Sequence, residues 1–314
     1  MLQERPLISV VVPVFNEEEC LPETFRRMLA LRESLLARAE CEFLFVDDGS
    51  KDRSLGLLKE AAAKETAVKV ISFSRNFGHQ IAITAGIDLA KGDYVAVIDG
   101  DLQDPPELIA SMYDLAVSGY DVVYGKRRSR AGETFFKKAT AAVFYRFFSY
   151  LCEIDVPTDT GDFRLMSRRV VEAFKQMRER HRFVRGMVPW VGFPAVPLEY
   201  NRDQRYAGET KYPLRKMIAF ASNAILSFSK KPLTLAIRLG VAMIFAGLVF
   251  AAYMLYLKLF TEIPVPGVTA VLLSISIFSG VQIFLIGIVG EYIARIFEEV
   301  KGRPLYLVLE TVNL

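Results

Sequence analysis

Two stretches without a charged residue constrain this chain most. Leu239 to Leu257 and Gly267 to Gly290 contain no Asp, Glu, Lys or Arg, whereas charge is spread through the first two thirds of the chain. Each stretch is roughly 19 to 24 residues long, and at about 1.5 Å per residue such a helix covers the ~30 Å hydrocarbon layer of a bilayer. A buried helix of a soluble protein is rarely so long and so uniformly apolar. The sequence therefore predicts two transmembrane helices.

Basic residues flank these stretches on their outer sides, whereas the segment that connects them offers Lys258 alone. The flanking residues are Lys211, Arg215, Lys216, Lys230, Lys231, Arg238, Arg295, Lys301 and Arg303. By the positive-inside rule, the N- and C-termini both face the cytoplasm. The first apolar run is broken by Pro13 and followed by acidic residues, which is not the layout of a signal peptide. We expect an integral protein of the cytoplasmic membrane with two spans.

The distribution of charge also indicates partners. A net charge of +3 is too small to argue for nucleic acid, and the basic residues gather near the apolar stretches, so anionic membrane lipids are the expected partners. Gly240 and Gly247, then Gly280 and Gly287, recur at a spacing of seven residues. Such small faces let helices pack closely, although glycine is also common in membrane helices. A homo-oligomer is therefore left open.

Strand-like and helix-like stretches alternate in the first part of the chain. Leu7 to Phe15 is a continuous apolar run rich in Val and Ile, as expected for a parallel strand covered on both faces. The other predicted strands are Glu42 to Val46, Val68 to Phe73, Tyr94 to Ile98 and Asp121 to Tyr124. The predicted helices are Glu18 to Arg38, Arg53 to Lys64, Gln80 to Ala90 and Glu107 to Val117. This order predicts an α/β fold with a doubly wound, mostly parallel sheet.

Acidic side chains follow two of these strands, at the edge where such sheets bind ligands. Asp99 and Asp101 flank Gly100 after the fourth strand. Two carboxylates so close repel each other, and a hard divalent cation such as Mg²⁺ or Mn²⁺ removes the repulsion and can bridge to a diphosphate. An exposed turn explains most isolated Asp-x-Asp sequences. Asp47 and Asp48 end the second strand and suit hydrogen bonds from a base or ribose. The alternative is that this acidic turn only caps the N-terminus of the next helix.

Two later stretches combine aromatic and basic residues. Glu133 to Tyr150 and Pro213 to Ser229 suit helices in the headgroup layer, while amphipathic core helices are the alternative. We therefore expect three parts. Residues 1–230 form the cytoplasmic domain with interfacial helices, residues 231–295 the two-helix transmembrane domain, and residues 296–314 a cytoplasmic tail.

Four motifs in this order resemble glycosyltransferase family 2 enzymes of the GT-A fold, and the similarity covers almost the whole chain. The motifs are Val12-Pro13-Val14-Phe15-Asn16-Glu17, Val46-Asp47-Asp48-Gly49-Ser50, Asp99-Gly100-Asp101-Leu102-Gln103-Asp104-Pro105-Pro106 and Gly161-Asp162-Phe163-Arg164-Leu165-Met166. The similarity is greatest to the dolichol-phosphate mannosyltransferase and polyprenyl-phosphate glycosyltransferase branch, especially bactoprenol glucosyltransferases.

The resemblance implies roles for individual residues. Asp162 would face the sugar and the reacting centre, and Arg205 or Lys211 would stabilise the departing diphosphate from a loop that closes over the donor. Asp99 and Asp101 would be the metal ligands. The remaining residues of the nucleotide-sugar site would be Pro13, Phe15, Glu17, Asp47, Asp48, Gly100 and Gln103.

Lys126, Arg127, Arg128 and Arg130 form the densest basic run of the chain. Such runs are usually solvated, but arginine's planar fork suits phosphate, so the run also fits a cradle for the phosphate of the acceptor. A monoester phosphate carries about −1.5 to −2 charges at pH 7 and is already a nucleophile. The reaction then needs no strong general base.

Taken together, we expect inverting, metal-dependent transfer of a hexose from a nucleotide sugar to polyprenyl (undecaprenyl) phosphate at the cytoplasmic membrane face. Glucose from UDP-glucose is the first expectation, and GDP-mannose or a UDP-amino sugar is the alternative donor. A non-catalytic membrane scaffold is the alternative from another class. A processive polysaccharide synthase lacks support because Trp190 follows Pro189, outside any Gln-x-x-Arg-Trp motif, and a nucleotide-dependent oxidoreductase lacks its Gly-x-Gly-x-x-Gly turn after the first strand.

Overall fold

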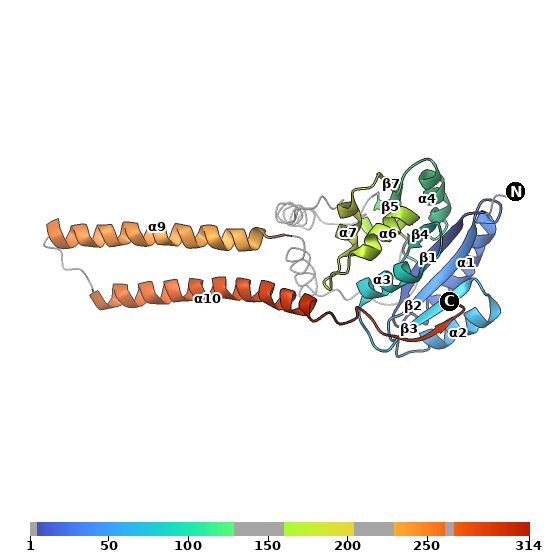
Figure 1. The fold of residues 1–314 in the computed structure, drawn as a ribbon, viewed down its shortest axis with the longest axis horizontal. Coiled ribbons are helices and arrows are strands. Elements are labelled where there is room, and N and C mark those ends of the chain that lie inside the picture. The colour runs from blue at the N-terminus through green and yellow to red at the C-terminus, as the bar shows by residue number, and fades with distance from the viewer. Residues whose placement is uncertain (1–4, 129–159, 204–228, 261–266) are drawn as a thin grey trace. The chain divides into compact units, whose positions relative to one another are not determined.

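The computed structural model describes residues 5–128, 160–203, 229–260 and 267–314 (Figure 1). These residues divide into two compact units. One unit contains residues 5–128, 160–203 and 303–314, and the other contains residues 229–260 and 267–302. The two predicted interfacial helices, at Glu133 to Tyr150 and Pro213 to Ser229, lie outside the described residues apart from Ser229.

The first unit is built on one eight-stranded sheet with the order β7-β5-β6-β4-β1-β2-β3-β8. Six strands run parallel, and β6 and β8 run antiparallel to their neighbours. The strands are β1 (Leu7–Val14), β2 (Glu40–Asp47), β3 (Val68–Phe73), β4 (Tyr94–Val97), β5 (Val122–Arg127), β6 (Thr160–Ser167), β7 (Ala195–Tyr200) and β8 (Val308–Val312). The mixed α/β fold with a mostly parallel sheet is therefore confirmed.

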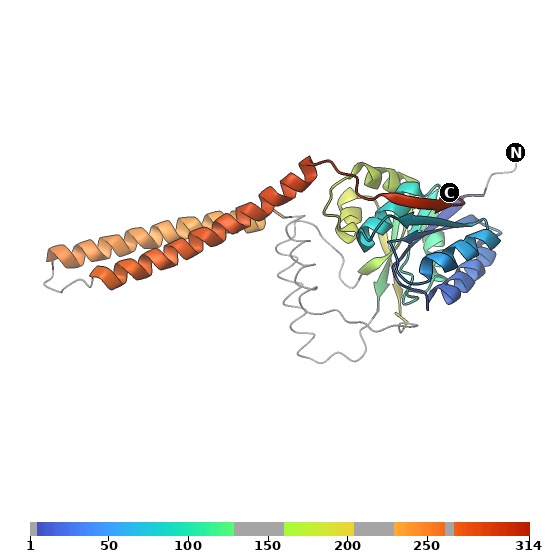
Figure 2. The same cartoon turned by 90° about the horizontal axis from the view of Figure 1, so that it is seen from below.

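Helices cover both faces of this sheet (Figure 2). Helices α1, α2 and α4 pack on one face, and α3, α6 and α7 pack on the other. Their bounds are α1 (Leu21–Leu35), α2 (Ser54–Lys64), α3 (His79–Leu89), α4 (Leu108–Val117), α6 (Arg168–Gln176) and α7 (Val184–Val191). A strand between two helical layers has no solvent face, which explains why β1 is a continuous apolar run rather than an alternating one.

The central strands end at a common edge. β1 pairs in parallel with β2 on one side and with β4 on the other. The order in which strands are added to the sheet therefore changes direction at β1. In doubly wound sheets this switch point is where ligands bind, beyond the carboxyl ends of the strands. The first four predicted strands agree with the structure within two residues at each end, but β5 continues to Arg127, three residues beyond its prediction.

Strands β6, β7 and β8 were not predicted. β6 inserts antiparallel between β4 and β5 and carries the polar residues Asp162 and Arg164 into the interior. β8 pairs antiparallel with β3 at the sheet edge. Residues 303–314, most of the segment expected to form a cytoplasmic tail, belong to the sheet unit.

Side chains of this C-terminal segment fasten it to the sheet unit. The ring of Tyr306 stacks on Phe73 with centroids 5.3 Å apart, and its hydroxyl donates to Asp88 at 3.1 Å. The Asn313 side-chain amide donates to the carbonyl oxygens of Ala62 at 2.7 Å and of Val68 at 3.0 Å. β8 is thus held by aromatic packing and hydrogen bonds in addition to its strand pairing.

The second unit consists of two long helices, α9 (Lys231–Phe260) and α10 (Gly267–Val300). Lys231–Phe260 and Ser274–Val300 are long and apolar enough to cross a bilayer, with mean hydropathies of 2.2 and 1.8. Only 6% and 0% of their most apolar windows are buried, whereas the core helix of a soluble protein would be mostly buried. Gly247 lies against Phe278 of the other helix, where an added Cβ would be 3.8 Å from its ring.

Candidate functional site

The loops after β1 and β2 are joined by backbone-to-side-chain hydrogen bonds. Asn16, at φ 54°, donates its N–H to Ser50 Oγ at 3.0 Å, and its side-chain oxygen accepts from the Lys51 N–H at 2.8 Å. The Glu17 N–H donates to Ser54 Oγ at 2.9 Å. Phe15 lies at the start of this rim and is 43% exposed. The predicted first and second motifs therefore form one continuous rim.

Asp47 and Asp48, both almost fully buried, hold this rim to the loop after β3. Asp47 accepts from the Ser72 hydroxyl at 3.0 Å and from the Ser50 N–H at 3.2 Å. Asp48 accepts from the backbone N–H groups of Phe77 at 2.6 Å and Gly78 at 2.9 Å. Both carboxylates thus make internal bonds, and their predicted contact with base or ribose stays a prediction.

The third motif forms the turn that follows β4. The carbonyl oxygen of Gly100 accepts from the Thr24 hydroxyl of α1 at 3.2 Å, and Asp101 Oδ1 accepts from the Gln103 N–H at 3.1 Å. Leu102 has φ 59°, an uncommon conformation for a branched side chain. The structure therefore brings Asp99, Gly100, Asp101 and Gln103 together on one turn beside the rim of β1.

Asp162 on β6 lies beside Asp99 but is fully buried. Its oxygens accept from Arg185 of α7, with Nε to Oδ1 at 3.1 Å and Nη2 to Oδ2 at 2.9 Å, and from Gln80 Nε2 at 3.2 Å. Burial alone would raise the pKa of Asp162, but the charge of Arg185 and hydrogen bonds from His79 and Arg185 hold it well below its usual range. A carboxylate with this environment is a poor general base.

His79, the first residue of α3, bridges the two carboxylates. Its Nε2 lies 3.3 Å from Asp99 Oδ1 and 3.4 Å from Asp162 Oδ2. Burial lowers the pKa of His79, but the hydrogen bond with Asp162 and the charge of Asp99 outweigh it, so the pKa is raised. Sequence reasoning missed His79, Gln80 and Arg185. His79 follows β3 at the same sheet edge as the acidic residues, and that position was the available signal.

The predicted basic run is divided by the strand on which it lies. Lys126 and Arg127 belong to β5 instead of following it, and neighbouring side chains on a strand point to opposite faces. Lys126 and Arg128 both pair with Glu199 of β7, at 3.3 Å and 3.7 Å. Arg127 instead reaches Asp104 at 3.8 Å. The run is therefore not a single cradle, and Arg130 lies outside the described residues.

Asp104 is the second fully buried carboxylate of the site. It accepts a hydrogen bond from the Tyr200 hydroxyl, and Arg202 Nε lies 3.7 Å from the same oxygen that Arg127 approaches. Arg127 lies on β5, and Arg202 follows the end of β7. Asp104 therefore brings together cations from two separate parts of the chain. The predicted loop residues Arg205 and Lys211 lie outside the described residues.

Comparison with known proteins shows the family to which this chain belongs. The family model described as Glycosyl transferase family 2 matches residues 9–174, more than half of the chain. The uncharacterized glycosyltransferase YkcC of Bacillus subtilis is 50% identical over 98% of this chain and 94% of its own length. The chain belongs to glycosyltransferase family 2.

Other comparisons extend over nearly the same length. A Shigella flexneri protein named SfII prophage-derived bactoprenol glucosyl transferase is 40% identical over 96% of this chain and 97% of its own. Among solved structures, glucosyl-3-phosphoglycerate synthase from Mycobacterium tuberculosis matches with a TM-score of 0.46 and 18% identity, covering 70% of this chain and 78% of that one. The family predicted from the four motifs is confirmed, and the chain is a glycosyltransferase.

The residues of this family 2 glycosyltransferase fit a divalent cation at Asp99. Its Oδ1 is buried without a hydrogen-bond partner among the described residues, although His79 lies nearby. Burial raises the pKa of Asp99 to about 6, and the charges of Asp162, Asp104 and Asp101 add to this effect while His79 opposes it. His79, Asp99 and Asp162 place ligand atoms within 4.8 Å of one another, but Arg185 and Gln80 already occupy Asp162. Asp99 with Asp101 is therefore the better oxygen pair.

Replacing Asp99 by asparagine is expected to stabilise the metal-free glycosyltransferase above about pH 7. With its pKa raised to about 6, folded Asp99 binds its proton more tightly than in the unfolded chain. This contribution to stability is complete below about pH 4 and is lost as the pH rises through about 6. In thermal unfolding with EDTA, we expect Asp99→Asn to raise Tm by a few degrees near neutral pH and by less near about pH 4.5. An unchanged Tm at both pH values would contradict the assigned cost of burying the charged carboxylate of Asp99.

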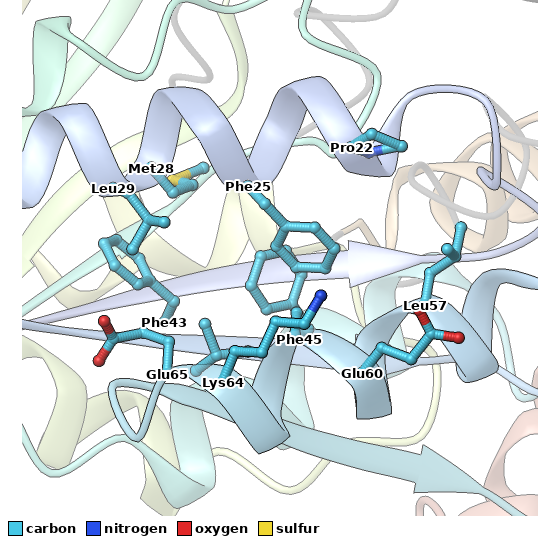
Figure 3. A pocket seen from close by; sticks show the side chains of 12 residues that line it. Pro22, Phe25, Met28, Leu29, Phe43, Phe45, Leu57, Glu60, Lys64 and Glu65 are labelled. Atoms are coloured by element: carbon cyan, nitrogen blue, oxygen red, sulfur yellow. The ribbon is translucent and has the colours of Figure 1, made fainter.

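A separate hollow of about 280 Å³ lies between α1 and α2 over β2 (Figure 3). Phe25, Phe43 and Phe45 line it together with the aliphatic part of Lys64. None of the residues that line it is a predicted site residue of the glycosyltransferase, and it lies under the helices instead of at the carboxyl edge of the sheet. The acidic rim, not this hollow, is the candidate active site.

Proposed function

We propose that this glycosyltransferase transfers a hexose from a nucleotide sugar to polyprenyl phosphate at the cytoplasmic face of the membrane, with inversion. The observation that carries the proposal is the 40% identity, over nearly the full length of both chains, to a protein named bactoprenol glucosyl transferase. Glucose from UDP-glucose is accordingly the proposed donor. The two long apolar helices with exposed side chains support a membrane location, and the basic residues at their outer ends support cytoplasmic termini.

The donor is proposed to bind along the rim formed by the first three motifs. Pro13, Phe15 and Glu17 would border the base, and Asp47 and Asp48 would accept from the base or ribose with their remaining lone pairs. Because both carboxylates already fix the loops after β2 and β3 in place, the rim is preorganised for its ligand.

The diphosphate is proposed to lie at the turn from Asp99 through Gly100 and Asp101 to Gln103. Mg²⁺ or Mn²⁺ held by Asp99 and Asp101 would supply positive charge that stabilises the departing nucleoside diphosphate. Arg205 and Lys211, in the loop outside the described residues, would add hydrogen bonds to the same phosphates. With the diphosphate bound at this turn, the acceptor phosphate would approach the sugar from the side away from the diphosphate.

The acceptor phosphate is proposed to be the nucleophile. One of its oxygens attacks the anomeric carbon, the bond from that carbon to the diphosphate oxygen breaks, and its electron pair leaves with the nucleoside diphosphate. A phosphate dianion needs no general base, which agrees with the depressed pKa of Asp162. Arg127, held by Asp104, is one described basic residue proposed to bind that phosphate, with Arg202 beside it.

The experiment that tests this function is transfer of radiolabel from a panel of nucleotide sugars into organic-extractable polyprenyl phosphate. We expect transfer with UDP-glucose, in the presence of Mg²⁺ or Mn²⁺. Transfer from GDP-mannose or a UDP-amino sugar alone would replace the donor but keep the reaction. No transfer from any donor would favour a non-catalytic scaffold.

A single displacement predicts that the anomeric centre inverts. UDP-glucose carries an α-linked sugar, so the lipid product should be the β-anomer. Proton NMR of the purified product measures this directly from the coupling of the anomeric proton. A retained anomer would rule out direct attack by the lipid phosphate.

A further inference from the structure

The environment of Asp162 differs from that of a residue that touches the sugar. A carboxylate has about four lone-pair sites, and Arg185 and Gln80 use three of them through bonds of 2.9 to 3.2 Å. His79 Nε2 lies 3.4 Å from Oδ2. The side chain is also fully buried. These contacts fit a residue that holds other side chains in position, and the contact with the sugar implied by the resemblance stays a prediction.

Two side-chain contacts fix the beginning of α7, which carries Arg185. Gln80 Oε1 accepts from the Val184 N–H at 2.8 Å, while Gln80 Nε2 donates to Asp162. Arg164, itself buried, donates to the Asp162 carbonyl oxygen at 3.2 Å and to the Val184 carbonyl oxygen at 3.4 Å. One glutamine and one arginine thus connect α3, β6 and α7 immediately next to Arg185. Such bonds restrict the guanidinium to one orientation.

Like His79, Arg185 reaches the surface. Its side chain is 31% exposed, against 0% for Asp162. A guanidinium carries five N–H donors in a planar fork that matches phosphate oxygens. Arg164 is buried nearby and its charge also interacts with that of Asp162. Asp162 also lies close enough to Asp99 to raise its pKa, which places the network beside the third-motif turn.

We propose that Arg185 binds phosphate oxygens of a substrate in the active site, and that Asp162 and Gln80 are positioning residues that aim its guanidinium. The inference rests on the proposed function for the source of the phosphate, which is either the donor diphosphate or the acceptor monoester. Both substrates offer phosphate oxygens that the guanidinium of Arg185 can bind. Kinetics with each substrate varied separately distinguish the two sources.

The test compares Arg185→Gln and Arg185→Lys in the full-length chain. We expect Arg185→Gln to raise the KM of one phosphate substrate roughly tenfold or more, because a charge-assisted pair is lost, and Arg185→Lys to recover part of that affinity. Arg178→Gln is the matched control. Arg178 makes a similar pair with Asp88, with Nη1 2.9 and 3.0 Å from the two carboxylate oxygens, and this pair lies away from the acidic rim. This control should leave both KM values unchanged.

The substrate whose KM rises identifies the source. A rise for the nucleotide sugar alone assigns Arg185 to the donor diphosphate, and a rise for polyprenyl phosphate alone assigns it to the acceptor. Both results support the proposal. A fall in kcat with both KM values unchanged, equal in the Gln and Lys variants, would overturn it and leave Arg185 as a structural partner of Asp162.

Calorimetry separates failure of this inference from failure of the proposed function. Inorganic pyrophosphate and inorganic phosphate are titrated into wild-type protein and Arg185→Gln, without any sugar or lipid. Binding that weakens in the variant supports the inference even if wild-type protein transfers no sugar to polyprenyl phosphate. Wild-type transfer with no dependence of binding or KM on Arg185 refutes the inference and leaves the proposed function standing.

Discussion

Asp101→Ala is expected to lose at least about a hundredfold in sugar transfer while the protein stays folded. Asp101 is one of the two carboxylates proposed to hold the cation, and it lies in the turn after β4 instead of in the core of the sheet. Removing it leaves Asp99 without its partner, so charge on the departing diphosphate is poorly stabilised. Radiolabel transfer to polyprenyl phosphate at saturating substrate gives the change in kcat, and calorimetry with Mn²⁺ gives the change in metal affinity.

Asp114→Ala is the control for this variant. Asp114 lies on α4, its side chain is 60% exposed, and it pairs with Arg38 on the helical face of the domain. An exposed pair of this kind contributes about 0–1 kcal/mol, so neither activity nor Tm should change measurably. Undiminished transfer by Asp101→Ala would remove Asp101 from the metal site, and a large fall in its Tm would attribute the loss to unfolding.

Deletion of residues 303–314 is expected to cost at least about 3–5 kcal/mol of stability in the sheet unit. The deletion removes β8, uncovers the edge of β3 and takes the Tyr306 ring off Phe73. Loss of one large aromatic side chain from a packed position already reaches this magnitude, and the bonds of Asn313 are lost as well. Thermal unfolding and limited proteolysis of the full and shortened chains in the same detergent measure the effect.

Glu310→Gln is the matched control within the same strand. It breaks the ion pair with Lys59, whose side chains are 37% and 43% exposed, and leaves β8 in place. We expect its effect to stay within about 1 kcal/mol. If the shortened chain unfolded at the same temperature as the full chain, β8 would contribute nothing to the stability of the sheet.

Four of the strands that sequence reasoning predicted share a continuous apolar run, which β6 and β8 lack. β1 to β4 are buried between two helical layers, so their apolar runs identify them without knowledge of their partners. β6 carries Asp162 and Arg164 inward, which breaks the apolar run. β8 depends on β3, more than two hundred residues earlier, and its exposed residues have no period that would identify a strand.

The site was predictable to the extent that its residues follow predicted strands. Asp47, Asp99 and Asp101 were located from that rule alone, and the structure places them at one edge. His79 follows β3 under the same rule, but a single histidine beside no predicted acidic pair gives no signal of its own in the sequence. Arg185 was beyond reach, since its role depends on the contact between β6 and α7, and neither element was predicted.

The position of β8 gives the chain an order of assembly. The edge strand β8 follows α9 and α10 in the sequence, so it is synthesised after both helices. Until then, the edge of β3 offers unpaired backbone groups, a template for wrong pairing with another chain. The two helices are in effect an insertion in a loop of the α/β domain, so they can enter a bilayer before that domain is complete. The sheet therefore closes only after both helices have been synthesised.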